Sequence, residues 1–562
     1  MILEHINDIA AICAGHGIQT AIISPGSRSA PLTLAFARHP ALETKVISDE
    51  RAAAFIALGM AQQQQKPVAL ICTSGSAAFN YAPAVAEAYF QEVPLLVLTA
   101  DRPPEWINQY DGQTIQQENI YGKHVKASFS YPDNPNQPDI AWHGNRIVNE
   151  ALLQCSAEPK GPVHINVPLR EPFYPEANEK TLFREVRPIK RPAPQAVLSD
   201  ENWKALTETW QLAHRRLIIG GQLTDTEDLV QALNSFSNKH HSPVVSDIIS
   251  NLHGLQNAIL HQDAFLCPEN DKENVGLIPD LLITFGKSNI SKNLKRFIRK
   301  HKPAHHWHIQ PHERYQDTFQ SLTRIIPMEP DAFFTAFHER LQDQPTSSAY
   351  LNEWLERDRK KRANVHSFFQ SQPFGEFETV NEVMSALPAD SQLHLANSMS
   401  VRYANFVGLR GRSDVKVFCN RGTSGIDGSN STAVGAALAQ DQLITLITGD
   451  MAFFYDRNAF WHNYPIHNLR IVLLNNHAGG IFRMIKGPSD QPELAEYFET
   501  EQLLTAENTA KDFGMEYKKV GDREELGKAL ADFYQPGPTA KILEVETDSA
   551  QNTAIFKAYK AL

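Results

Sequence analysis

Cysteine is scarce in this chain of 562 residues, and the cysteines it has are unpaired in sequence. There are five, none in a CxxC pair: Cys13, Cys72, Cys155, Cys267 and Cys419. This scatter indicates neither a disulfide framework nor a cysteine-based zinc site. It is typical of reduced core residues in a cytosolic protein.

Long apolar runs are also missing. No stretch reaches the ~18 uninterrupted apolar residues that a membrane-spanning helix needs. The first residues, MILEHINDIAAICAGHG, are partly acidic with a helical apolar period, unlike the basic start and apolar core of a signal peptide. We therefore expect a cytoplasmic protein without an integral membrane segment.

The chain has no excess of positive charge. Lys and Arg total 53 against 64 Asp and Glu, a formal net charge of −11, which argues against binding nucleic acid or an anionic membrane surface. Hydrophobic residues make up 42%, as in soluble globular proteins. The length exceeds a single core, so we expect about three or four domains.

What the chain does contain, from Ile18 onward, is an alternation of strand-like and helix-like segments. It runs through QTAIISPGSRSAPLTLAFA, TKVISDERAAAFIALGMAQQ, PVALICTSGSAAFNYAPAVAEAYF and VPLLVLTADRPP. This βαβ pattern predicts a parallel sheet, whose ligands bind beyond the carboxyl ends of the strands. The polar clusters at that edge are Ser27-Arg28, Asp49-Glu50, Thr73-Ser74-Gly75 and Asp101-Arg102.

Eight prolines between Pro159 and Pro194 predict a domain exit and a linker. A second α/β block follows, with strand ends in RRLIIGGQ, SPVVSDIIS, IPDLLITFGKS and HHWHIQP. Residues 286–288 read Gly-Lys-Ser but lack the earlier glycine of a phosphate-binding P-loop. His306 and His308 share one strand face without a cysteine or carboxylate nearby, so we interpret them as surface or edge histidines.

Two short apolar runs in the last third, 443–448 and 469–474, predict neighbouring strands buried in a parallel sheet. The first ends in Gly449-Asp450 and the second in Asn475-Asn476, with a short crossover helix expected over 456–463. A carboxylate, an amide oxygen and a backbone carbonyl suit a Mg²⁺ that also binds phosphate oxygens. The pattern favours a diphosphate anchor, with ordinary strand-end turns as the alternative.

Upstream of these strands, Gly422, Gly425 and Gly428 recur at steps of three before a small-residue helix that begins near Ser429. Such a loop lets backbone N–H groups approach an anion, and the helix N-terminus adds partial positive charge. The spacing differs from the dinucleotide fingerprint. It indicates a phosphate-binding loop, with a plain tight turn as the alternative.

Together these features resemble thiamin-diphosphate enzymes of the pyruvate-decarboxylase type, whose signature is Gly-Asp-Gly followed later by Asn-Asn. Here Gly449-Asp450-Met451 precedes Asn475-Asn476, and one branch tolerates the methionine. That branch, the 2-succinyl-5-enolpyruvyl-6-hydroxy-3-cyclohexene-1-carboxylate synthases (MenD), is also similar elsewhere. Its other motifs appear here as SPGSRSAPL, DERAAAF, TSGSA, TADRPPE, NSMSVR, NRGTSGIDG and NNHAGGIF, in the same order.

The resemblance implies an α/β fold of three doubly wound parallel-sheet domains. These are a pyrimidine-binding domain at 1–185, a central domain at 195–345 and a diphosphate-binding domain at 355–562. It implies thiamin diphosphate with Mg²⁺ or Mn²⁺, and Glu50 as the catalytic carboxyl on the cofactor's aminopyrimidine ring. The implied metal ligands are Asp450, Asn476 and the carbonyl of Ala478. The other implied cofactor contacts are Thr73, Gly75, Gly422, Ser424, Met451 and Ile426, the last as an apolar wedge.

The implied reaction decarboxylates 2-oxoglutarate on the cofactor and adds the succinyl unit to isochorismate, in menaquinone biosynthesis. Each substrate carries two carboxylates, which call for fixed guanidinium groups. The implied substrate residues are Ser27, Arg28, Arg102, Gln113, Lys292, Ser398, Arg402, Arg421, Ile481 and Phe482. In this family the cofactor lies between the first domain of one subunit and the third domain of its partner, which implies a homodimer or homotetramer.

Three alternatives remain. Another thiamin-diphosphate carboligase or 2-oxo acid decarboxylase, such as an acetohydroxyacid synthase-like enzyme, would need a small apolar pocket, which the arginines disfavour. A non-catalytic binding protein with this fold is disfavoured by the presence of Glu50 and Asp450. A dinucleotide-dependent oxidoreductase would need a glycine-rich fingerprint that the middle block lacks.

Overall fold

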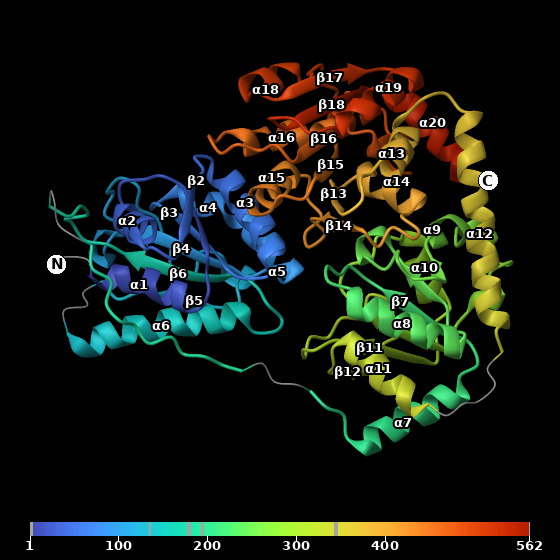
Figure 1. Cartoon of the computed structure of the whole chain (residues 1–562), viewed down its shortest axis with the longest axis horizontal. Helices are drawn as coiled ribbons and strands as arrows, with labels where there is room; N and C mark the ends of the chain where they lie inside the picture. Colours follow the sequence, from blue (N-terminus) through green and yellow to red (C-terminus); the bar gives the residue numbers. More distant parts are fainter. Residues whose placement is uncertain (1–3, 134–136, 177–180, 193–195, 342–346, 561–562) are drawn as a thin grey trace.

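The computed structural model describes residues 4–133, 137–176, 181–192, 196–341 and 347–560. It contains three six-stranded sheets whose neighbouring strands are all parallel, one in each of three domains (Figure 1). Alternate residues of the central strands enter separate cores on the two faces of each sheet. The predicted fold of three doubly wound domains is confirmed. Within the described ranges, no helix is long and apolar enough to cross a membrane.

The first sheet has the strand order β2-β1-β3-β4-β6-β5. Its strands are β1 (Thr20–Ile23), β2 (Glu43–Val46), β3 (Val68–Cys72), β4 (Leu95–Asp101), β5 (Ser128–Ser130) and β6 (Val163–Pro168). Its helices are α1 (Glu4–Gly15), α2 (Ala30–Arg38), α3 (Glu50–Gln64), α4 (Ser76–Asn80), α5 (Ala82–Gln91) and α6 (Pro138–Ser156).

Strand β6 corrects the predicted linker. It lies in the first part of the proline-rich stretch, is buried throughout and pairs with β4 and β5. Pro159 and Pro162 precede the strand and Pro168 ends it, so no proline ring removes a hydrogen-bond donor from its interior. The domain exit therefore begins after Pro168. Within this stretch, residues 177–180 and 193–195 lie outside the described residues.

The central sheet has the order β12-β11-β10-β7-β8-β9. Its strands are β7 (Arg216–Gly220), β8 (Val244–Ser246), β9 (Ala258–Ile259), β10 (Leu281–Phe285), β11 (His305–Ile309) and β12 (Arg324–Ile326). Its helices are α7 (Asp200–Leu212), α8 (Glu227–His240), α9 (Gln262–Phe265), α10 (Lys292–Lys300) and α11 (Pro330–Arg340), and α12 (Ala349–Gln370) runs on toward the third domain (Figure 1).

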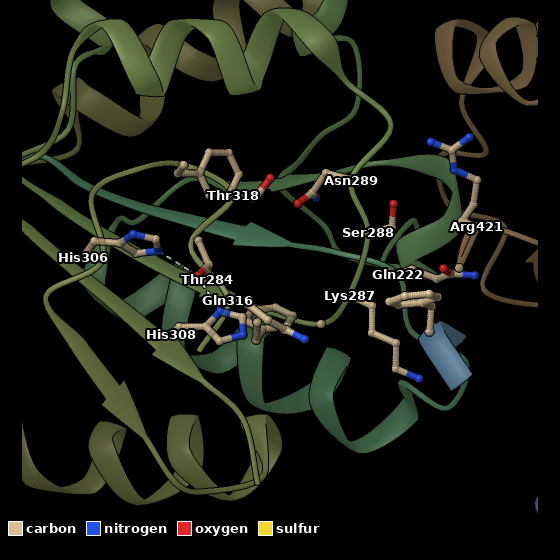
Figure 2. Close-up of a pocket in the computed structure, with 15 residues that line it drawn as sticks. Gln222, Thr284, Lys287, Ser288, Asn289, His306, His308, Gln316, Thr318 and Arg421 are labelled. Atoms are coloured by element: carbon tan, nitrogen blue, oxygen red, sulfur yellow. Dashed lines mark hydrogen bonds between the residues drawn. The ribbon is translucent and has the colours of Figure 1, made fainter. Parts of the chain in front are cut away.

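The interpretation of His306 and His308 as surface or edge histidines is wrong. Strand β11 lies between β10 and β12, and these side chains are only 1% and 7% exposed. Both rings hydrogen-bond the hydroxyl of Thr284 on β10, at 2.9 and 2.8 Å (Figure 2). Burial lowers the pKa of each to about 4, so both rings are neutral near pH 7.

The third sheet has the order β14-β13-β15-β16-β18-β17. Its strands are β13 (Ser391–Leu395), β14 (Val415–Cys419), β15 (Ile444–Gly449), β16 (Leu469–Asn475), β17 (Glu516–Val520) and β18 (Lys541–Glu546). Its helices are α13 (Glu376–Ser385), α14 (Met399–Val407), α15 (Ser429–Ala439), α16 (Asp450–Tyr455), α17 (Ile481–Met484), α18 (Glu507–Asp512), α19 (Arg523–Phe533) and α20 (Ser549–Lys560). The two predicted apolar strands are β15 and β16, and they pair in parallel. A short 3₁₀-helix at Arg457–Phe460 lies within the segment where the crossover helix is expected, and α16 precedes it.

Helices α3 and α15 join the first and third domains (Figure 1). A Cβ atom at Gly59 would lie 2.1 Å from the carbonyl oxygen of Thr432, and one at Gly435 would lie 2.1 Å from that of Ile56. The two backbones are therefore in direct contact, which only glycine permits at these positions.

We expect Gly59→Ala to lower the midpoint of thermal unfolding by several degrees, because the added methyl group overpacks this contact. Gly527→Ala in α19 is the matched control, since a Cβ there meets open space. It should leave the midpoint unchanged or raise it slightly. Circular dichroism during heating measures both, and equal midpoints for the two variants would contradict the close-contact argument.

Candidate active site

A cavity of about 610 Å³ opens at the carboxyl edge of the third sheet. It lies between the neighbouring strands β13 and β15, where the strand order of the sheet reverses: β13 connects to β14 on one side and β15 connects to β16 on the other. Ligands of doubly wound sheets usually bind at such a switch point. Eleven sequence-predicted residues line it: Ser398, Arg402, Arg421, Ser424, Ile426, Asp450, Met451, Asn476, Ala478, Ile481 and Phe482. The cavity therefore combines the proposed metal ligands with part of the proposed substrate set.

Asp450 and Asn476 follow the adjacent strands β15 and β16, as the sequence predicts. Asp450 is 2% exposed, and its carboxylate accepts hydrogen bonds from Met451 N and Gln502 Nε2, both at 2.8 Å. Burial raises its pKa to about 6. The Oδ1 atom of Asn476 accepts from Ala478 N at 3.0 Å. A desolvated carboxylate is thus held beside an amide at one end of the cavity.

Two guanidinium groups lie along the same cavity. Arg421 donates to Asn397 Oδ1 at 2.9 Å, and Arg402 donates to the carbonyl of Ser398, which has a left-handed backbone with φ of 71°. Burial, and then the charge of Arg421, lowers the pKa of Arg402. The two cations therefore repel across a partly buried space, and a dicarboxylate would relieve that repulsion.

The backbone N–H groups of the glycine-rich loop have a different partner from the phosphate that the sequence predicts. Its N–H groups at Gly422 and Thr423 donate to the buried carboxylate of Glu87, on α5 of the first domain, at 2.7 and 2.6 Å. Gly422 therefore already has an anion, and it does not line the main cavity. Ser424 and Ile426 do line it, and Ile426 is 37% exposed, as an apolar wedge requires.

The predicted first-domain residues gather at the carboxyl edge of their own sheet and do not line this cavity. Glu50 is half-buried at the start of α3, which Asp49 caps by accepting from Ala52 N. Burial and then the charge of Glu50 raise the pKa of Cys72, so Glu50 lies close to the end of β3. Thr73 follows there, its Oγ1 buried without a partner among the described residues. Gly75 comes next, with φ of 91°.

The two arginines predicted as substrate residues in the first domain have intramolecular partners. Arg28 is buried, donates to the carbonyl of Leu169 at 2.8 Å and lies over the ring of Phe173. Arg102 donates to the carbonyl of Gly112 and pairs with Asp111 at 3.2 Å, beside a separate cavity of about 770 Å³. Ser27 and Gln113 are exposed, and Gln113 packs beside Gly75.

The central domain has its own cavity of about 260 Å³, at the carboxyl ends of β7 and β10 (Figure 2). Residues 286–289, Thr284 and both buried histidines line it, and Arg421 reaches it from the third domain. Lys292 lines neither cavity and is exposed at the start of α10. Burial, and then the charges of Lys292 and Arg402, lowers the pKa of Lys560.

Sequence reasoning missed several cavity residues, chiefly Glu376, Asn397, Tyr497 and Phe498. Asn397 directly precedes the predicted Ser398 and could have been found from its motif. Tyr497 and Phe498 lie on a π-helical segment (Leu494–Glu499), a rare conformation that local patterns do not reveal. Glu376 is the first residue of α13, a position where acidic residues are common for helix stability alone.

The residues present fit thiamin diphosphate with a divalent cation. Asp450, Asn476 and the carbonyl of Ala478 are hard oxygen donors of the kind that Mg²⁺ and Mn²⁺ bind. The orphaned Thr73 hydroxyl, at the edge that holds Glu50, is a polar group that a ligand could satisfy. Among these three donors Asp450 is the one carboxylate. Within the described part of the chain, no three His, Cys, Asp or Glu side chains cluster so that they could hold a metal ion.

Comparison with known proteins assigns the whole chain to one family. Three family models match in order: the N-terminal binding domain of thiamine pyrophosphate enzymes over 5–121, the middle domain over 187–395 and the C-terminal binding domain over 402–542. Thiamine pyrophosphate is another name for thiamin diphosphate.

Several relatives that align over nearly their full length share the name 2-succinyl-5-enolpyruvyl-6-hydroxy-3-cyclohexene-1-carboxylate synthase. The protein from Cytophaga hutchinsonii is 49% identical, covering 99% of this chain and 98% of the relative. Proteins from Flavobacterium johnsoniae and Flavobacterium psychrophilum are 39% and 40% identical, each covering 98% of this chain and 97% of the relative. The chain therefore belongs to the thiamin-diphosphate-dependent enzymes, in the family of 2-succinyl-5-enolpyruvyl-6-hydroxy-3-cyclohexene-1-carboxylate synthases.

Proposed function

We propose that this protein is a 2-succinyl-5-enolpyruvyl-6-hydroxy-3-cyclohexene-1-carboxylate synthase, a thiamin-diphosphate-dependent transferase. It decarboxylates 2-oxoglutarate and joins the succinyl unit to isochorismate, a step of menaquinone biosynthesis. The observation that carries the proposal is the single cavity in which Asp450 and Asn476 stand at one end and Arg402 and Arg421 line the wall. A carboligase for small apolar substrates would have no use for two guanidinium groups there.

The site residues have two roles toward the cofactor: one group binds the cation of the diphosphate, and Glu50 contacts the aminopyrimidine ring. Thiamin diphosphate, when bound, supplies the carbon nucleophile and the electron sink. Asp450, Asn476 and the carbonyl of Ala478 hold the cation that neutralises its diphosphate. Glu50 would hydrogen-bond the cofactor's aminopyrimidine ring and so support the acid–base chemistry that this ring supplies when bound.

Substrate recognition falls to the cationic and apolar walls of the cavity. Arg402 and Arg421 bind substrate carboxylates as fixed guanidinium groups. Ile481 and Phe482 line the apolar side and exclude water from the reacting atoms. Lys292, at the exposed start of α10, adds positive charge outside the cavity.

The active site is completed by a second copy of the chain. Support comes from the division of the site residues: the cavity is lined by residues 376–500, whereas Glu50, Thr73 and Gly75 lie at the edge of another sheet. A homodimer, or a tetramer built from two dimers, brings the first domain of one copy to the third domain of another. The corresponding domains are 1–185, 195–345 and 355–562, of which the limits 195 and 345 fall outside the described residues.

One assay tests the activity. The purified protein is incubated with thiamin diphosphate, Mg²⁺, 2-oxoglutarate and isochorismate, and the loss of isochorismate absorbance is followed. We expect consumption that depends on all four additions. If pyruvate replaces 2-oxoglutarate without loss of rate, the protein is instead a carboligase for small 2-oxo acids.

Asp450→Ala is expected to abolish Mg²⁺-dependent binding of thiamin diphosphate, because it removes the only carboxylate of the proposed metal set. Isothermal titration calorimetry, with and without Mg²⁺, measures this directly. The matched control is Asp414→Ala in the same domain, where the half-buried carboxylate pairs with Arg412 and does not line the cavity. Cofactor affinity that survives in Asp450→Ala would rule out this anchor.

A further inference from the structure

Glu376 has no role in the assignment above, although it lines the same cavity. It is the first residue of α13 and is only 3% exposed. Buried carboxyl groups are costly unless they are hydrogen-bonded or paired with a cation. The position of this one therefore calls for an explanation.

The side chain of Glu376 contacts a proposed metal ligand. Asn476 Nδ2 donates to Glu376 Oε1 at 2.6 Å, while Asn476 Oδ1 accepts from Ala478 N at 3.0 Å. A carboxylate can accept only from the NH₂ end of the amide. Rotating the amide by half a turn would set its oxygen against the carboxylate and its NH₂ group against a backbone N–H.

The surroundings hold this pair in place. The backbone N–H of Glu376 donates to Asn552 Oδ1 on α20 at 3.0 Å, which ties the start of α13 to the last helix. A Cβ atom at Gly480 would lie 3.0 Å from Asn476 Nδ2, so the backbone at Gly480 packs closely against the amide. The carboxyl and the amide thus meet in a packed environment.

We propose that Glu376 is a positioning residue of the cation site: it accepts the hydrogen bond of the Asn476 amide and keeps the amide oxygen turned toward the metal. This inference rests on the proposed metal set of Asp450, Asn476 and Ala478. It assigns to Glu376 the orienting role that carboxylates beside metal ligands commonly have.

The test measures cation affinity directly. Mn²⁺ is titrated into each variant in the presence of saturating thiamin diphosphate, and free Mn²⁺ is read by electron paramagnetic resonance. Glu376→Met keeps the length of the side chain but removes the acceptor, and Mn²⁺ affinity should fall about 10–100-fold. Glu376→Gln keeps a carbonyl oxygen in the same place and should stay within about threefold of the unaltered protein.

A second pair of variants separates orientation from a merely structural effect. In an Asn476→Asp background both ends of the side chain are oxygens, so no orientation needs to be imposed. Glu376→Met should then cause no loss of Mn²⁺ affinity relative to Asn476→Asp alone, and a gain is expected because it removes the repulsion between two facing carboxyls. Circular dichroism and thermal unfolding without metal show whether each variant is folded, and Glu376→Ser replaces the methionine variant if that one is not.

The outcomes are distinct. Unchanged Mn²⁺ affinity in Glu376→Met, or an equal loss in Glu376→Gln, overturns the positioning role. The same holds if the loss persists in the Asn476→Asp background. Asp450→Ala is run in parallel: if it too binds Mn²⁺ normally, the metal set itself is wrong, whereas a loss there with none in Glu376→Met removes only the inference about Glu376.

Discussion

Glu50→Gln should bind thiamin diphosphate with nearly unchanged affinity and lose turnover by about 10²–10⁴-fold, the usual range for removing a general acid–base group. Glutamine has the size of glutamate but cannot hold the proton that the aminopyrimidine ring requires. Binding should survive because the diphosphate anchor lies in the third domain. Calorimetry gives the affinity, and loss of isochorismate absorbance gives the rate.

A matched variant separates this effect from a general loss of acidic charge. Glu43 lies on the same sheet in β2 and is exposed, with an ion pair to Lys45. Glutamine keeps an oxygen that can accept the hydrogen bond of Lys45, so Glu43→Gln should retain the full rate. A Glu50→Gln protein as active as Glu43→Gln would remove Glu50 from the catalytic role.

Asp450 and Asn476 show what sequence patterns can locate. Short unalternating apolar runs predict strands buried on both faces of a parallel sheet, and β15 and β16 are such strands. Parallel neighbours end at one edge, so the polar residue after each strand is placed by topology alone. This reasoning placed Asp450 and Asn476 at one edge, where both line the cavity, without any knowledge of the cavity's other residues.

Contacts between distant segments lie beyond such patterns. The amide of Asn476 meets Glu376 across 100 residues, and the amide of Gly422 meets Glu87 across 335. Neither pairing leaves a local period in the sequence. Similarly, His306 is buried because β11 lies between strands β10 and β12, which the residues next to it in the sequence do not reveal. Hydrophobic patterning predicts elements and edges, whereas packing between domains decides which polar groups remain free.

The division of the site between two domains leads to a complementation experiment. Neither Glu50→Gln nor Asp450→Ala alone should be active. If each active site takes Glu50 from one chain and Asp450 from another, a heterodimer of the two variants contains one doubly altered site and one unaltered site. With two different affinity tags, the heterodimer can be purified, and it should recover about half of the unaltered activity.

This recovery depends on the assembly and not on the strength of either substitution. A site built within a single chain would always contain one altered residue, so the heterodimer would be as inactive as its parents. Mixed homodimers that do not exchange subunits provide the control, because they contain the same chains in the same amounts. Activity that appears only in the doubly tagged species would place Glu50 and Asp450 on opposite sides of a subunit interface, which no single-chain measurement can do.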